Sequence, residues 1–147
     1  PDMLVAPDGE TVAVRGADGR LHFLRPPADK FIARAWLRRD GDSRDIAQAV
    51  GMEGLRCDAL GCVVTRKGVT IAASMRAEAL ADDCQRAQLV VSAVTVRNCK
   101  GPALVIDREA ANAGQGWEIT LSSPPRAQSV REWRGSRPWV AAINTAE

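Results

Sequence analysis

Four cysteines constrain the fold of this 147-residue chain more than any other feature. They are Cys57, Cys62, Cys84 and Cys99, spaced as C-x4-C and C-x14-C. An even number of cysteines suits two disulfides, and four cysteines allow three pairings. We favour Cys57–Cys62 and Cys84–Cys99 because each pair closes a short local loop. The alternatives are four reduced thiols in a cytosolic domain and a four-cysteine zinc site, which the absence of C-x2-C pairs disfavours.

Composition and length indicate a globular protein. Hydrophobic residues are 46% of the chain and charged residues 26%, which excludes a disordered chain. We expect a single globular domain over residues 1–139 and a flexible tail over 140–147. The longest uncharged run, 87–96, is too short to span a bilayer. Because the chain begins at a proline, we expect it to be a piece of a longer protein, and paired cysteines favour an oxidising compartment such as the periplasm.

Turn signals and hydrophobic periodicity predict an α/β fold, with α+β as the alternative: a mixed sheet arrangement with outer helices. Asp-Gly turns separate the first strands, and Asp29 is a candidate helix cap. In chain order we expect strands over 3–6, 10–15 and 21–25, helices over 30–39 and 44–50, a hairpin of 62–66 and 69–74, a helix from a Ser74 cap to Arg86, buried strands over 88–94 and 103–106, a helix over 107–113, a hairpin of 117–121 and 128–131, and an irregular segment over 133–139.

The chain has a single histidine, His22, which the pattern places on a strand. Zinc hydrolases, Ser–His–Asp enzymes and Cys–His enzymes all use histidines, and a metal site with several histidines cannot be built in this chain. We interpret His22 as a surface or rim residue. The adjacent acids Asp82 and Asp83 point about 100° apart on a helix and therefore do not form an acid/base pair. No phosphate-binding glycine motif is present.

Basic residues form a row on the helix predicted over 30–39. Lys30, Arg34 and Arg38 recur every four residues, Arg39 adjoins them, and this helix contains no acid. A DNA strand can follow such a row through phosphate contacts. The alternative is an ordinary solvated helix face.

A second basic segment lies near the end of the chain, where arginines alternate with tryptophans. Arg–Trp alternation favours stacking of bases. In the alternative interpretation, the tryptophans pack on the core and the arginines extend along it into solvent. The residues concerned are Arg126, Arg131, Arg134 and Arg137, with Trp133 and Trp139.

Six short segments, taken in their order, resemble the C-terminal soluble region of ComEC-family DNA-uptake proteins from alpha-class proteobacteria. The resemblance covers residues 3 to 139. The segments are VAVRGADGRL (12–21), WLRRDGD (36–42), RCDALGCV (56–63), ALADDC (79–84), VIDR (105–108) and RGSRPW (134–139).

The resemblance implies a fold and a location. ComEC proteins are inner-membrane channels that pass one DNA strand during natural transformation, and many carry a C-terminal domain of metallo-β-lactamase fold. The opening strand pair of that fold corresponds to residues 3–24, but no H-x-H-x-D-H loop follows it. The later segment that usually carries histidines falls at 89–96 and has none. The resemblance therefore implies a shortened, degenerate metallo-β-lactamase-like domain, onto which no catalytic residue is carried over.

We therefore expect a non-catalytic periplasmic domain of a ComEC-type channel, without a cofactor, that supports the channel or guides incoming DNA. The expected partners are the transmembrane region of the channel, single-stranded or duplex DNA, and other competence proteins. One alternative is a nuclease whose metal is bound by carboxylates such as Asp82, Asp83 and Asp107. The other is a protein-docking module without DNA contact.

Overall fold

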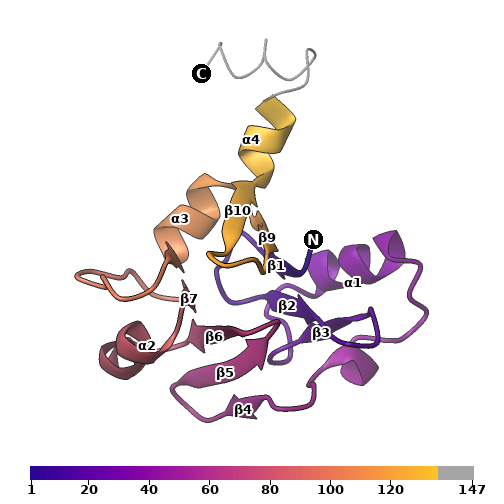
Figure 1. Ribbon diagram of the computed structural model, residues 1–147. Coiled ribbons are helices and arrows are strands. Elements are labelled where there is room, and N and C mark those ends of the chain that lie inside the picture. Colours follow the sequence, from indigo (N-terminus) through magenta and orange to yellow (C-terminus); the bar gives the residue numbers. More distant parts are fainter. Residues whose placement is uncertain (136–147) are drawn as a thin grey trace.

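Two five-stranded sheets form the centre of the protein, and a computed structural model describes them within residues 1–135 (Figure 1). Arg137, Trp139 and the predicted tail lie outside the described residues. The first sheet is antiparallel throughout, in the order β10 (Arg126–Ser129), β9 (Trp117–Thr120), β1 (Met3–Val5), β2 (Val12–Arg15) and β3 (Leu21–Phe23).

The second sheet is mixed. Its order is β4 (Arg56–Cys57), β5 (Gly61–Arg66), β6 (Val69–Ser74), β7 (Leu89–Ser92) and β8 (Leu104–Ile106). The first three strands are antiparallel, whereas β6, β7 and β8 run parallel. A crossover through the 3-10 helix η2 (Ala77–Ala79) and α2 (Leu80–Arg86) joins β6 to β7. The predicted mixed content of helices and sheets is confirmed, in an α+β arrangement.

Alternate side chains along a strand join different buried clusters, which shows which face of each sheet meets the other sheet. Met3 and Val5 of β1 face the shared core together with Ile71 of β6 and Val91 of β7, all almost fully buried. The residue between the first two, Leu4, points to the opposite face, towards α1 (Lys30–Arg39). Because side chains alternate along a strand, each sheet has one face for the common core and one for a helix.

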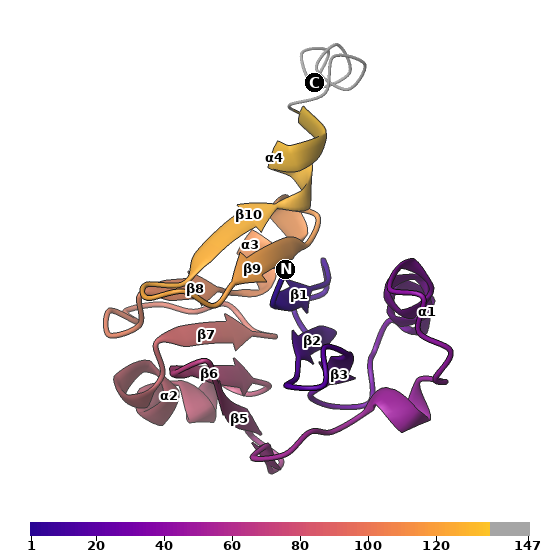
Figure 2. The ribbon, with the colours of Figure 1, turned by 45° about the vertical axis from the view of Figure 1, so that its right-hand side comes forward.

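The resulting layers are helix, sheet, sheet and helix (Figure 2). On one side, Ala33 and Leu37 of α1 are buried on the first sheet, and Trp36 stacks on Phe23 with ring centroids 6.2 Å apart. On the other side, α2 packs on the second sheet around Val90. The remaining helices are the 3-10 helix η1 (Ala47–Ala49), α3 (Arg108–Ala113) and α4 (Val130–Gly135).

Both disulfides have the pairing that the cysteine spacing favours. Cys57–Cys62 joins β4 to β5 at directly opposed positions. Cys84–Cys99 ties α2 to the loop between β7 and β8. Within residues 1–135, no helix is long and apolar enough to cross a membrane.

The structure corrects two expectations. Ser74 does not cap a helix: it is the last residue of β6, paired with Ser92, and its hydroxyl donates to buried Asp83 at 2.6 Å. The segment from Trp133 is not irregular as far as it is described, because it belongs to α4. The Ser129 hydroxyl, which accepts a hydrogen bond from the backbone N–H of Glu132 at 3.0 Å, starts that helix.

Candidate nucleic-acid interface

The basic row of α1 borders a pocket of about 750 Å³. Lys30, Arg34 and Arg38 all line it, and all three side chains are exposed. None of the three forms an ion pair or hydrogen bond with another residue in the part of the chain that the structure describes. The helical spacing therefore brings three unpaired positive charges to one rim; the sequence predicted the row on the helix, but not the pocket beside it.

Apolar side chains form the floor of this pocket. Leu37 enters from α1, two prolines from the segment that precedes the helix, and the rest from the loop that follows it. The pocket thus combines a charged rim with an apolar interior, a combination typical of sites for ligands that are partly ionic and partly flat and apolar. The apolar lining residues are Pro26, Pro27, Leu37, Ile46, Ala47 and Val50.

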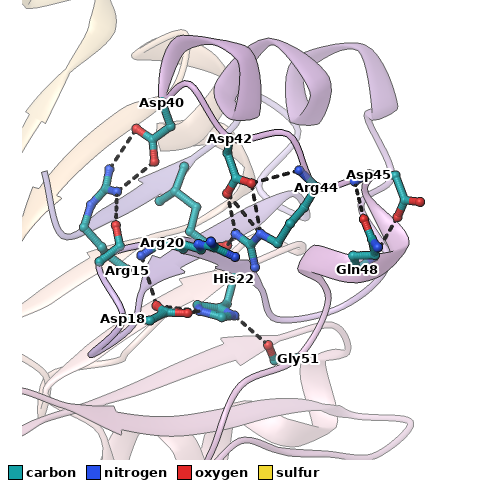
Figure 3. A network of polar contacts seen from close by, with 12 residues as sticks. Arg15, Asp18, Arg20, His22, Asp40, Asp42, Arg44, Asp45, Gln48 and Gly51 are labelled. Atoms are coloured by element: carbon teal, nitrogen blue, oxygen red, sulfur yellow. Dashed lines mark hydrogen bonds and ion pairs between the residues drawn. The ribbon is translucent and has the colours of Figure 1, made fainter.

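The wall opposite α1 is the loop between Asp40 and Gly51, and a polar network fixes it (Figure 3). Asp42 and Arg44 form a largely buried ion pair, with Nη2 2.7 Å from Oδ2. Arg44 also donates to the backbone carbonyl of Leu21 in β3. Hydrogen bonds from the Arg44 guanidinium hold the pKa of Asp42 below its usual range. The loop is therefore tied to the first sheet by a charged contact.

His22 holds the far end of the same loop. Its Nδ1 lies 3.0 Å from the carbonyl oxygen of Gly51, and its Nε2 lies 3.0 Å from both carboxylate oxygens of Asp18 (Figure 3). The hydrogen bond from His22 lowers the pKa of Asp18 to about 2. The backbone N–H of Gly51 also donates to the carbonyl of Phe23 at 2.8 Å. His22 is thus a partly buried rim residue with a structural role, close to the sequence interpretation.

A further ion pair anchors the end of α1. Arg15 of β2 contacts both oxygens of Asp40, at 2.8 and 3.2 Å. Its hydrogen bond with Asp40 raises the pKa of Arg15. Together with the N-cap, where Asp29 accepts from the backbone N–H of Ile32 at 3.0 Å, this contact fixes both ends of the helix that carries the basic row.

The other predicted basic residues do not join this pocket. Arg39 lies on the other side of α1, in a separate groove of about 460 Å³ that Arg134 of α4 also lines. Both are engaged: Arg39 lies 3.9 Å from Glu118, and Arg134 donates to Gln115 at 3.2 Å. Arg131 lines a different depression beside α3. The fold therefore brings Arg39 and Arg134 to one groove and separates both from the α1 row, and Arg137 lies outside the described residues.

Each of the three acids of the nuclease alternative already accepts a hydrogen bond or forms an ion pair. Asp82 pairs with Arg86 at 2.9 Å, and Asp83 accepts from Ser74. Asp107 caps α3 by accepting from the backbone N–H of Ala110, and it also accepts from Val96. Within the described range, no three side chains of His, Cys, Asp or Glu are grouped so that they would hold a metal ion.

Comparisons of the chain with models of protein families, with curated proteins and with solved structures found no match. The case for the site therefore depends on its geometry. Sequence reasoning found the charged rim but missed the apolar floor and the acid Asp45 on the facing wall. The only local features of the sequence that pointed to these segments were Pro26-Pro27, which ends the third predicted strand, and the short helix expected over 44–50. In the structure that helix is reduced to one 3-10 turn, η1.

Proposed function

We propose that this domain guides DNA by contacts to the phosphate backbone, as a non-catalytic part of a ComEC-type DNA-uptake channel. The observation that carries the proposal is the row of Lys30, Arg34 and Arg38, exposed and unpaired among residues 1–135. Neighbouring members are separated by four residues, or about 6 Å along the helix axis. Three charges at this spacing contact successive backbone phosphates without base specificity.

The remaining argument is the resemblance to ComEC proteins. A shortened metallo-β-lactamase-like domain is expected to have two facing sheets with helices outside, and the layers described above are compatible with that arrangement. Two disulfides favour an oxidising compartment, in line with the periplasmic face of the inner membrane. In this proposal the transmembrane region of the channel is the covalent or docking partner, and the domain presents α1 to incoming DNA.

Salt-dependent binding tests the proposal. The probe is a fluorescein-labelled single-stranded oligonucleotide, followed by fluorescence anisotropy over a series of salt concentrations. Releasing counterions from three phosphates of a single strand contributes about −2 to the slope of log K against log salt. We expect the triple variant Lys30→Ala, Arg34→Ala, Arg38→Ala to bind more weakly and to lose about that much of the slope.

The chain offers a matched control on the α2 side of the molecule. Arg76, Arg97 and Lys100 are also two arginines and one lysine, with exposed side chains that form no hydrogen bond or ion pair among the described residues. Replacing them by alanine changes the net charge equally, and we expect it to leave the slope unchanged. An equal loss of affinity and of salt slope in the two triple variants would overturn the proposal, as would the absence of binding by the wild type at low salt.

A further inference from the structure

The floor of the pocket lies beside the phosphate-binding row, and phosphate contacts do not explain it. Backbone phosphates need only the charged rim. The interior is formed by Pro27, Ile46 and Val50, which offer no hydrogen bond from their side chains. A strand of DNA with unpaired bases has both kinds of group, charged phosphates and flat apolar bases, alternating along its length.

We propose that this pocket is a subsite for one unpaired base of the strand whose phosphates contact the α1 row. The inference rests on the proposed function and adds a selectivity to it. A duplex buries the faces of its bases in the stack, so a base reaches the pocket only from a single strand or after costly unstacking. The site therefore prefers single-stranded DNA to duplex, and strands with bases to an abasic backbone.

The facing wall adds a hydrogen-bond acceptor. Asp45 lines the pocket, and its Oδ1 accepts from the backbone N–H of Gln48 at 2.8 Å. Its second carboxylate oxygen has no hydrogen-bond partner among residues 1–135. A carboxylate accepts from the exocyclic amino group of cytosine, whereas thymine has no such donor. The pocket is thus expected to favour cytosine over thymine.

Charge also argues against a purely apolar occupant such as a lipid chain. The wall contains the buried Asp42–Arg44 pair and the exposed Asp45. A hydrocarbon chain seated on this wall would remove water from Asp45 without giving it a donor, which is unfavourable. A base with an amino group compensates for the water that it displaces.

The first experiment compares four labelled probes of equal length with the wild-type chain: oligodeoxycytidylate, oligothymidylate, an abasic backbone and a duplex. We expect oligodeoxycytidylate to bind about fivefold or more tighter than the abasic backbone, the lower range for stacking of one base. We expect oligothymidylate to lie between them. Equal affinity for the abasic backbone and oligodeoxycytidylate would overturn the base subsite while leaving the phosphate contacts intact, whereas no binding of any probe would overturn the proposed function.

The second experiment fills the pocket. Ala47 is exposed and lines the interior, so Ala47→Leu occupies the space without changing charge or the buried core. We expect this variant to bind oligodeoxycytidylate as weakly as the abasic backbone, with an unchanged salt slope. Ala81→Leu, at an exposed position of α2, is the matched control and should bind as the wild type does. Unfolding by urea verifies that both variants fold.

Two more variants test where the unpaired base binds. Asp45→Asn keeps an acceptor for Gln48 but removes the charge, and it should abolish most of the preference for cytosine over thymine. Phe31, which is 75% exposed on α1, is the competing stacking platform. Loss of the base contribution in Phe31→Ala, together with normal binding by Ala47→Leu, would place the base on the outer face of the helix and overturn the pocket assignment.

Discussion

At the scale of single residues, His22 joins three separate backbone segments. Its two ring nitrogens face the carbonyl of Gly51 and the carboxylate of Asp18, and both partners are acceptors. The contact with Gly51 secures the end of the loop that forms one wall of the pocket. The contact with Asp18 accounts for the lowered pKa of that carboxyl group.

The pH dependence of stability follows from Asp18. Its pKa in the folded chain is about 2, below the ordinary value of 3.8. A lowered carboxyl pKa stabilises the fold above the ordinary value, and that contribution is lost as the pH falls towards about 2. We expect Asp18→Asn to be less stable than the wild type at pH 5 and the difference to shrink by pH 2. Urea unfolding at a series of pH values measures the difference in unfolding free energy between the two proteins. A difference that stays constant with pH would contradict the lowered pKa of Asp18.

The cap of α1 also acts through one residue. Asp29 accepts from the backbone N–H of Ile32, and such caps contribute about 1 kcal/mol. We expect Asp29→Ala to lower the free energy of unfolding by about this amount. Lys30→Ala, which removes no hydrogen bond or ion pair among the described residues, should change it by less than about 0.5 kcal/mol. Urea unfolding compares the two, and equal effects would show that the cap contributes nothing.

At the scale of elements, the two disulfides stabilise different parts of the second sheet. Cys57–Cys62 holds the two-residue strand β4 on β5, and Cys84–Cys99 holds the long β7–β8 connection on α2. Their sequence separations are 5 and 15. Because the entropy lost by the unfolded chain grows with loop length, the second bond is expected to contribute more.

We expect Cys84→Ser/Cys99→Ser to lower the free energy of unfolding by about 3 kcal/mol and Cys57→Ser/Cys62→Ser by about 2 kcal/mol, on the chain-entropy argument. Urea unfolding of the three oxidised proteins gives both numbers. Thiol titration of the denatured wild type before reduction should find no reactive thiol. Four reactive thiols would contradict both bonds and return the protein to the reduced alternative.

At the scale of the whole molecule, β1 lies at the centre of the first sheet, between β2 and β9. Its inward side chains Met3 and Val5 pack in the core shared with the second sheet. The pairing of β1 with β9 also brings the start of the chain beside a strand more than a hundred residues later. The core that the two sheets share is larger than the cluster that each sheet buries under its own helix, and unfolding of either sheet would expose it.

The two sheets are therefore expected to unfold together. Hydrogen exchange of backbone amides in β1 and β7 should require the same opening free energy, equal to that of global unfolding. Amides of α4, which has no buried residue, should exchange at a much lower free energy. A clearly lower value for one of the two sheets would show that the layers unfold separately.

Local patterns in the sequence accounted for α1, the two disulfides, the β5–β6 hairpin and the basic row, because capping, loop closure and helical spacing act over a few residues. The tertiary structure alone decided that the two sheets face each other, that Arg39 is separated from Lys30, Arg34 and Arg38, and that Ile46, Val50 and Asp45 lie opposite them. These contacts join segments that are distant or differently oriented, and their positions depend on how the faces of whole sheets and helices pack. The positive charges of the site could be predicted from the sequence, whereas the shape of the pocket depends on how the helix, the loop after it and the first sheet pack together.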